Sequence, residues 1–347
     1  MQINQILTDA ARQLFTDAVT PAHVRAIEGG EETAALWQAF EDAGFPDALV
    51  PEEQGGSGLA LADVHGLLEA CGEFVVPLPL ADTVLARGLL SLQGRNVPAG
   101  STVFGVGRLG ADGSLRCSLV RFGRVAGHVL VHDGAMLRVL AVADAVRKPA
   151  AFCLDAALEW PADVVGKADA FEPHDTQDSV LDDAPLLLAA LSACVQLGGA
   201  LQAVFNRTLQ YANERQQFGR PIGKFQAIQH QLAVMSEHVF AARMASQLAV
   251  SAGRILPDAN RVAIGKASTG EAAVAVAALS HSIHGAIGFT EEYDLQLYTR
   301  RLHQWRQTGG TESFWHERLG SAAICGDSGS VLDFLRAATD PVAVGAN

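Results

Sequence analysis

Three long helical segments follow one another in the second half of the chain, and they limit what the fold can be. Apolar residues recur at helical spacing over 184–214, 225–252 and about 258–284, and shorter helices are predicted from there to the end. The second segment carries its apolar residues on one face: Phe225, Ile228, Leu232, Met235 and Val239. Helices with one apolar face must bury that face against each other, so the sequence predicts a bundle over residues 181–347.

The first of these segments begins with a run that is apolar enough to raise the question of a membrane. APLLLAALSACVQLGGAL, residues 184–201, reaches the ~18 residues that a spanning helix requires. Ser192, Gln196 and the pair Gly198-Gly199 interrupt it, and polar residues follow directly. Asp182 or Asp183 is the predicted N-cap, with a proline in the first turn. We therefore predict a buried helix and no membrane contact.

The first half of the chain divides into a helical part and a part rich in short strands. Helical spacing over residues 1–98 predicts an N-terminal helical domain. Between 99 and 180, short β-favouring runs alternate with glycine and aspartate turns, as in a small antiparallel sandwich or barrel. A chain of 347 residues with 49% hydrophobic content is long enough to give each of these parts its own hydrophobic core. The predicted fold class is mainly α with an inserted β domain.

Charge and cysteine content exclude several classes of function. The formal net charge is −13 and the pI is near 5.2, which disfavours a nucleic-acid partner because phosphate binding needs a basic face. The five cysteines are scattered and form no CxxC pair, so we predict neither a disulfide framework nor a metal site. The N-terminus lacks the apolar core of a signal peptide, and a cytoplasmic location is expected.

Four stretches of the chain resemble the acyl-CoA dehydrogenase family. They are LVPEEQGGSGLALADV (49–64), RQQFGRPIGKFQAIQHQLAVM (215–235), HSIHGAIGFTEEYDLQLYTRRLHQW (281–305) and GGTESF (309–314). The resemblance covers nearly the whole chain. It implies an N-terminal helical domain, a middle β-barrel or sandwich, a C-terminal four-helix bundle, and a tetramer. The third stretch is similar to the branch whose members handle bulky or steroid-type acyl-CoA thioesters.

The resemblance also implies FAD as the cofactor and names the residues that would hold it. The second stretch supplies Arg215, Phe218, Phe225 and Gln226, and the third and fourth supply Ser282, Gly285, Ala286, Gly288 and Thr311. Arg215 offers a planar fork of donors that suits a pyrophosphate. In the family, the matching arginine reaches the FAD of the neighbouring subunit. Ser282 and Ala286 depart from the usual glutamine and glycine, and residues 99–180 contain no TEPxxGSD-like loop for the flavin ring.

The family's reaction needs a carboxylate, and this sequence lacks one at both usual positions. A base removes the α-proton of the thioester while the flavin takes the β-hydride. The two family positions for this glutamate fall on Gly309 and Ala189, so the catalytic base is unknown. Three glutamates lie nearby in the motifs: Glu291, Glu292 and Glu312. Charged side chains in such loops are more often solvated surface groups. His284 likewise has an ordinary interpretation, as a hydrogen-bonded histidine at a helix end.

These observations leave three hypotheses open. The chain is an acyl-CoA dehydrogenase, acting on an acyl-CoA and an electron-transfer acceptor, with its base elsewhere. Alternatively, it is a catalytically incompetent subunit that pairs with a paralogous, glutamate-bearing chain in a heterotetramer rather than a homo-oligomer. The third hypothesis is a relative that uses the same fold for nitroalkane or hydroxylation chemistry.

Overall fold

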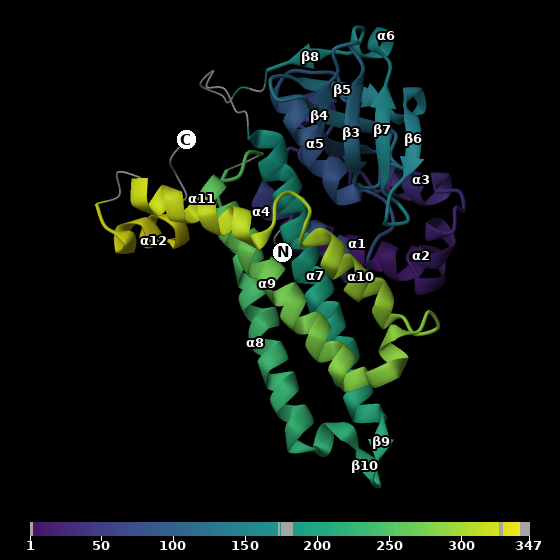
Figure 1. The fold of residues 1–347 in the computed structure, drawn as a ribbon, viewed down its shortest axis with the longest axis vertical. Helices are drawn as coiled ribbons and strands as arrows, with labels where there is room; N and C mark the ends of the chain where they lie inside the picture. The colour runs from purple at the N-terminus through teal and green to yellow at the C-terminus, as the bar shows by residue number, and fades with distance from the viewer. Residues whose placement is uncertain (1–2, 173, 175–182, 254, 326–328, 341–347) are drawn as a thin grey trace.

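The computed structural model of the protein describes residues 3–172, 174, 183–253, 255–325 and 329–340. Strands gather at one end of the molecule, and three long helices run from them to the opposite end (Figure 1). The predicted fold class, mainly helical with an inserted β domain and a C-terminal bundle, is confirmed. All described strands except one short hairpin lie between Thr102 and Phe171. The domain boundaries at 98 and 180 stay predictions.

The N-terminal helices pack around an aromatic cluster. They are α1 (Ile3–Ala18), α2 (Pro21–Glu28), α3 (Ala34–Asp42), α4 (Leu61–Glu73) and α5 (Leu80–Leu92). The Phe15 ring meets the Phe40 and Phe45 rings edge-on at centroid distances of 5.6 and 6.3 Å. Gly44 follows α3 with φ +70°, and its N–H donates to the carbonyl of Glu41 at 2.9 Å, so a glycine at this position ends the helix.

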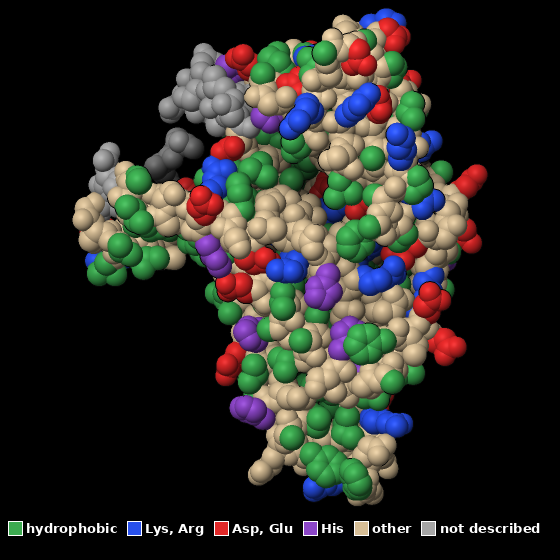
Figure 2. All heavy atoms as spheres, in the orientation of Figure 1, with side chains coloured by type: hydrophobic (Ala, Val, Ile, Leu, Met, Phe, Trp, Pro, Cys, Tyr) green, Lys and Arg blue, Asp and Glu red, His purple; other side chains and the backbone are tan. Residues whose placement is uncertain are grey.

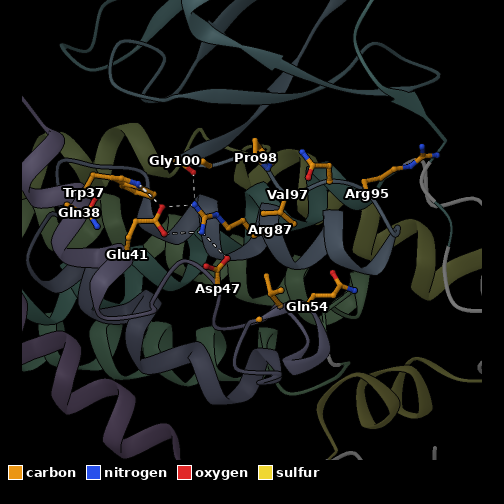
Figure 3. Close-up of a pocket in the computed structure, with 14 residues that line it drawn as sticks. Trp37, Gln38, Glu41, Asp47, Gln54, Arg87, Arg95, Val97, Pro98 and Gly100 are labelled. Atoms are coloured by element: carbon orange, nitrogen blue, oxygen red, sulfur yellow. Dashed lines mark hydrogen bonds and ion pairs between the residues drawn. The ribbon is translucent and has the colours of Figure 1, made fainter.

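A buried arginine ties this helical part to the chain segment that leads into the first strand (Figure 3). Arg87 on α5 is 4% exposed and donates to Glu41 at 2.7 Å and to Asp47 at 2.8 Å. Its Nη2 also donates to the carbonyl of Gly100 at 2.9 Å. These groups line a hollow of about 670 Å³. Glu41 and Asp47, the carboxylates beside this hollow, are already paired with Arg87. We therefore interpret the hollow as part of the connection between the helices and the first strand, and not as a ligand-binding site.

The strands form two four-stranded sheets that pack as a sandwich. The first sheet has the order β1 (Thr102–Val106), β4 (His128–His132), β5 (Leu137–Ala141), β8 (Ala170–Phe171). The second has the order β2 (Arg108–Leu109), β3 (Leu115–Val120), β7 (Ala156–Trp160), β6 (Val146–Pro149), with the short helix α6 (Ala162–Val165) after β7. The prediction of a purely antiparallel unit was wrong in one pair, because β1 runs parallel to β4, with Thr102 opposite His128.

The sandwich buries its own core between the sheets. Val103, Val129 and Val131 from the first sheet meet Leu115, Leu158 and Trp160 from the second, and all six are at most 2% exposed. The Trp160 indole N–H donates to the carbonyl of Ala141 at 2.7 Å, which satisfies the one polar group that this core side chain brings. β7 buries alternate residues, whereas β1 and β4 bury consecutive ones.

The second half of the chain folds into the predicted bundle. Its long helices are α7 (Ala184–Glu214), α8 (Gln226–Ala249) and α9 (Ala259–His284), followed by α10 (Leu295–Trp305), α11 (Glu312–Cys325) and α12 (Val331–Thr339). On α8, the predicted stripe is buried at Leu232, Met235 and Val239. Between α7 and α8 lie a hairpin of β9 (Gln216–Gln217) and β10 (Arg220–Pro221) and a 3₁₀ turn, η3 (Ile222–Lys224).

The start of α7 differs from the prediction in one detail. Asp183 occupies the N-cap position, but its side chain makes no capping hydrogen bond and instead pairs with Arg318 on α11. Asp182 lies outside the described residues. By length and composition alone, α7 and the segment Ala259–Phe289 could cross a membrane. Of their apolar windows, 83% and 44% are buried inside the protein, and α7 has the burial of a core helix.

Candidate functional site

The predicted site residues gather at two places, at opposite ends of α7. One group lies around the β9–β10 hairpin, which we call the tip, defined as residues 215–226 and 281–288. The other lies where the start of α7 meets the sandwich and the loop between α10 and α11, which rises toward the sheets (Figure 1). At about 1.5 Å of rise per residue, Ala189 and Arg215 are roughly 39 Å apart along α7.

Arg215 stands exposed at the C-terminal end of α7. Its backbone N–H donates to the carbonyl of Tyr211, and its own carbonyl accepts from Ile222, both at 2.8 Å, so the backbone around it is held. Its guanidinium has no hydrogen bond or ion pair among the described residues. Arg220 behaves differently, because its guanidinium carbon lies 4.2 Å from the centroid of the Phe225 ring. Arg215 is therefore free to bind an anion, and so is Lys224 of η3, which is exposed and also has no ion pair among the described residues.

Phe218, Phe225 and Gln226 lie beside this arginine. Phe218 has φ +53° and is 91% exposed, and its ring meets that of Phe225 edge-on at a centroid distance of 6.1 Å. Gln226 is exposed at the first residue of α8, where unpaired backbone N–H groups favour negative charge. These residues form a surface with an aromatic group, a cation and a helix N-terminus, which matches the chemistry of a dinucleotide.

The C-terminal end of α9 brings the third stretch to the same tip. The Gln231 amide on α8 donates to Ser282 Oγ at 3.3 Å, which joins the two helices there. Gly285 has φ +65°, and a Cβ at this position would meet nothing within 4 Å, so Gly285 and the exposed Ala286 leave open space for a ligand. Gly288 is buried, and a Cβ would lie 3.1 Å from His284 Cβ. Close packing against His284 is enough to explain why residue 288 is a glycine. The contact of Gly288 with FAD stays a prediction.

His284 is explained by the structure of the helix end. It is 4% exposed, its Nδ1–H donates to the carbonyl of Ser280 at 2.8 Å, and its ring stacks on Tyr211 at a centroid distance of 4.3 Å. Burial lowers the pKa of His284 below its ordinary value, so the ring is neutral at pH 7. Its interpretation as a hydrogen-bonded histidine at a helix end agrees with this geometry.

At the other end of α7, both family positions for the base line one pocket. Ala189, from the first turns of α7, and Gly309, from the α10–α11 loop, face a cavity of about 230 Å³. The remaining walls come from β1, β3 and the residues after it, His132 of β4, the 152–155 segment and α10. Figure 2 shows a hollow on this face of the molecule, between the strands above and the helices below. The tertiary structure thus brings together two positions that lie 120 residues apart in the sequence.

Gly309 cannot carry a side chain in this fold. Its φ is +66°, and a Cβ would lie 2.6 Å from both the backbone nitrogen and the Cα of Ala190. Backbone atoms of a helix cannot move aside, and a distance below 3 Å is a clash. The absence of a carboxylate here is therefore built into the packing of the loop against α7.

The three glutamates that the sequence offered as substitutes do not lie in this pocket. Glu312 on α11 pairs with Arg306 through two hydrogen bonds of 3.0 and 2.9 Å. Burial acts to raise the pKa of Glu312, but the hydrogen bonds and charge of Arg306, a backbone hydrogen bond and the charge of Lys266 together hold that pKa below its usual value. Glu291 and Glu292 are exposed in the loop before α10, near the tip. Thr311 also lies apart from the other cofactor-binding candidates, beside Gly309 and Gly310.

Sequence reasoning missed the polar residues that do line the pocket. Asp155 is 2% exposed, and its oxygens accept from the N–H of Phe122 at 3.0 Å and the amide of Gln304 at 2.7 Å. Burial raises the pKa of Asp155, although both of these hydrogen bonds act to lower it. Arg121, 7% exposed, also lines the pocket. Neither residue stands in a motif, because strand ends and loops far apart in sequence bring them together.

Comparisons with known proteins agree with this fold and site. Residues 183–324 match the family "Acyl-CoA dehydrogenase, C-terminal domain". The chain is 31% identical over 302 residues to the acyl-CoA dehydrogenase IpdE2 of Mycolicibacterium smegmatis, covering 86% of this chain and 92% of that protein. Among solved structures, the Tcur3481-Tcur3483 steroid ACAD (G363A variant) superposes with a TM-score of 0.78 at 27% identity, over 93% of this chain and 98% of that one.

A further solved structure shows the same fold at lower identity. Butyryl-CoA dehydrogenase from Megasphaera elsdenii superposes with a TM-score of 0.77 at 18% identity, covering 93% and 98% of the two chains. The family match and these relatives place the chain in the class of flavin-dependent oxidoreductases. The chain belongs to the acyl-CoA dehydrogenase family, and FAD is its cofactor.

The residues of the tip fit part of this cofactor. The unpaired guanidinium of Arg215, the N-terminus of α8 and the open backbone at Gly285 suit the pyrophosphate and its neighbours. When bound, FAD supplies the hydride acceptor for oxidation of a CH–CH bond. The cavity at the other end of α7 is lined by both family positions for the base, and neither of them contributes a proton acceptor.

Proposed function

We propose that the chain is one subunit of a hetero-oligomeric acyl-CoA dehydrogenase that acts on a bulky, steroid-type acyl-CoA, and that a paralogous partner supplies the catalytic glutamate. The observation that carries the proposal is the geometry of Gly309. Residue 309 lacks a carboxylate, and it also has no room for one, because the backbone of α7 occupies the space that any side chain would need. Ala189 leaves the second family position without a proton acceptor as well.

The separation of tip and pocket supports an assembly. One FAD molecule does not reach over the roughly 39 Å between Ala189 and Arg215. A flavin held at the tip of this chain therefore has its ring system against another subunit. A tetramer with such shared flavins is consistent with the exposed, unpaired state of Arg215. A cytoplasmic location and an electron-transfer acceptor belong to the same proposal.

The steroid-type substrate is proposed from the relatives. The solved structure at 27% identity is a steroid ACAD. The pocket of this chain has apolar walls from Phe104, Leu119, Phe152 and Leu186, which favour a hydrocarbon ring over a polar group.

A co-expression experiment tests the proposal. The chain is purified alone and together with a paralogous chain that carries the glutamate. Both preparations are then assayed by dye-coupled oxidation against straight, branched and steroid-type acyl-CoA thioesters. A general base is typically worth about 10² to 10⁴ in rate, so the single chain should fall far below the ~10 s⁻¹ median of enzymes. We expect turnover only from the co-purified complex. Turnover above about 1 s⁻¹ from the single chain contradicts the proposal.

One observation favours a second candidate, an autonomous dehydrogenase. Among the described residues that line the pocket, Asp155 is the sole carboxylate, and its raised pKa suits a base. Both of its oxygens are already hydrogen-bonded, which argues for a structural role. If the single chain proves active, loss of that activity in Asp155→Asn identifies Asp155 as the base.

A further inference from the structure

A groove runs over the outer face of the second sheet, whose strands β3, β7 and β6 lie side by side (Figure 1). Its volume is about 880 Å³, and its walls come from the end of β1, from β2 and the turn after it, and from β3, β7 and β6. Three large apolar side chains line it although they are 69%, 47% and 60% exposed: Val106, Leu109 and Val146. Apolar side chains that gather in an exposed groove indicate a ligand or a partner.

The groove is basic in a chain that is acidic as a whole. The chain has 25 Lys and Arg residues against 38 Asp and Glu residues, whereas three basic and two acidic side chains line the groove. Both carboxylates are engaged, because Glu159 pairs with Arg116 at 2.8 Å and Asp112 accepts two hydrogen bonds within its own turn. Arg108 and Lys148 are exposed and have no hydrogen bond or ion pair among the described residues. The groove therefore offers two free cations.

The pairing of β2 with β3 brings two of the three cations together. Arg108 lies directly opposite Arg116 in the register of these strands, and both side chains are exposed. Like charges at directly opposed positions destabilise a strand pair. Glu159 lies opposite Arg116 on the other neighbouring strand, β7, and pairs with that arginine. An anion bound beside Arg108 would remove the remaining repulsion, so a ligand explains an arrangement that strand pairing alone does not favour.

The groove continues into the cavity beside Ala189. Val106 lines both spaces, and on β3 Ser118 lines the groove while the next residue, Leu119, lines the cavity. A ligand with one end in the cavity can therefore place the rest of its length along the sheet. That part of the ligand needs apolar groups for the walls and negative charges for the cations. A CoA ester has both, because its pantetheine arm leads from the thioester to a diphosphate and a 3′-phosphate.

Two other anionic occupants suit the groove less well. The net charge of −13 disfavours docking of the protein on an anionic membrane, since the rest of its surface is repelled. FAD carries a diphosphate but no 3′-phosphate, so it leaves more of the positive charge of the groove unbalanced. The charges therefore favour the nucleotide of CoA.

We propose that this groove binds the phosphorylated nucleotide end of a CoA ester, and that Arg108 and Lys148 bind its phosphates. Neither residue lies in a stretch that carries the family resemblance. The two residues then determine the affinity for the nucleotide and take no part in the chemistry. The identification of the ligand as a CoA ester rests on the proposed function. The binding itself needs neither a partner chain nor turnover.

Binding to the purified full-length chain tests the proposal. The probes are coenzyme A, dephospho-coenzyme A, which lacks the 3′-phosphate, and pantetheine, which lacks the nucleotide, and isothermal titration measures each affinity. An exposed ion pair typically contributes up to about 5-fold in affinity. Coenzyme A should therefore bind about 2- to 5-fold more tightly than dephospho-coenzyme A, and at least about 10-fold more tightly than pantetheine. Raising the salt from about 0.05 M to about 0.5 M should weaken the binding of coenzyme A but not of pantetheine.

Three variants and a control locate the effect. Arg108→Gln and Lys148→Gln should each weaken the binding of coenzyme A by about 2- to 5-fold, and the double variant by about 10-fold, with pantetheine unchanged. Lys167→Gln removes the same charge from an exposed lysine of the same domain that does not line the groove. It should bind coenzyme A as the native chain does. All of these side chains are exposed, and the melting curves should stay unchanged.

Four results overturn the proposal: no binding of coenzyme A, equal affinity for coenzyme A and pantetheine, unchanged affinity in the double variant, or an equal loss in Lys167→Gln. Titration of FAD into the chain saturated with coenzyme A distinguishes the two nucleotides. Displacement of coenzyme A by FAD at similar affinity would assign the groove to the flavin and contradict the proposal. Turnover by the single chain contradicts the proposed function and leaves these affinities unaffected.

Discussion

Gly309 shows how a single backbone position determines what this chain can do. Its left-handed φ of +66° and its contact with the backbone of α7 leave no room for a Cβ. A glutamate introduced there cannot occupy the place of the family's base unless the loop moves. We therefore expect Gly309→Glu to restore no dehydrogenase activity to the single chain.

The smaller substitution Gly309→Ala tests this steric restriction through its effect on the free energy of unfolding. A left-handed backbone costs a non-glycine residue about 1–2 kcal/mol, and overpacking adds roughly 1–3 kcal/mol. We expect the free energy of unfolding, measured by urea titration, to fall by about 3 kcal/mol or more. Gly44→Ala is the matched control, because Gly44 has φ +70° and open space around it, and it should lose only the first contribution. Equal losses in both variants would refute the steric argument.

Lys266 carries a second prediction at this scale, because it is fully buried beside the same loop. Its Nζ donates to the carbonyls of Arg306 at 2.7 Å and Gly310 at 3.0 Å. Burial lowers the pKa of Lys266 to about 8. The folded protein therefore releases this proton at a lower pH than the unfolded chain, whose lysine has a pKa of about 10.4. A neutral amine still has two hydrogens for both carbonyls.

The stability of the native protein relative to Lys266→Met should therefore rise with pH between about 8 and 10.4. In that range the unfolded chain binds more protons than the folded protein, which makes the slope positive. We expect a gain on the order of 1–3 kcal/mol, measured by urea titrations of both proteins at matched pH values. All other titrating groups are common to the two proteins and cancel in the difference. A flat difference over this range would show that Lys266 keeps an ordinary pKa.

At the scale of elements, the close crossing of α4 and α7 joins the N-terminal helices to the bundle. A Cβ on Gly199 of α7 would lie 1.9 Å from the carbonyl oxygen of Glu69, and a Cβ on Gly72 of α4 would lie 1.9 Å from that of Gln196. The two helices therefore touch backbone to backbone, and each glycine makes room for the other helix. Beside them, Glu69 pairs with Arg243 of α8 at 2.8 Å, which adds a third helix to the junction.

Gly199→Ala should force α4 and α7 apart. We expect a loss of roughly 2–5 kcal/mol in the free energy of unfolding, because neither backbone can relax without opening the core. Gly320→Ala on α11 is the matched control, since its Cβ would meet nothing within 4 Å. That variant should gain up to about 1 kcal/mol from helix propensity. Thermal or urea unfolding of both variants would refute the argument if the two changes had the same sign.

At the scale of the whole molecule, the tip and the pocket lie too far apart to serve one flavin within one chain. Arg215 is exposed and unpaired among the described residues, while the pocket lies against the sandwich at the other end of α7. Ile283 and His284 of the tip are buried, whereas Arg215, Phe218 and Gln226 are exposed. We propose that a bound ligand accounts for these exposed residues. We therefore propose that this chain contributes to flavin binding only within an assembly.

Arg215→Ala should weaken flavin binding without unfolding the protein. A charge-assisted hydrogen bond typically contributes about 10-fold to 100-fold in affinity, so the flavin dissociation constant of the assembled protein should rise by that factor. Fluorescence titration with FAD measures the affinity, and circular dichroism should show an unchanged melting curve. Arg220→Ala, whose partner is the Phe225 ring, is the control and should affect flavin less. An unchanged affinity in Arg215→Ala would remove this residue from the site.

The periodicity of apolar residues was sufficient to predict the long helices, because burial of one face every 3.6 residues is a local property of the chain. The range 184–214 coincides with α7, and the strands fall within the predicted 99–180. The predicted helix ranges also placed Arg215 in the turn between two long helices, and its contact with FAD stays a prediction. The resemblance to the family placed Gly309 and Ala189 at the two usual base positions, although it could not show that they share a pocket.

The tertiary structure alone decided what surrounds that pocket. Arg121, Asp155 and Gln304 come from three separate segments, and no periodicity links residues whose proximity depends on how the sandwich packs on α7 and α10. The parallel pairing of β1 with β4 has the same origin, since pairing direction follows from the path of the chain between strands and not from their composition. Whether Gly309 can accept a side chain was also undetermined until α7 was placed beside it, because sterics depend on neighbours that are distant in sequence.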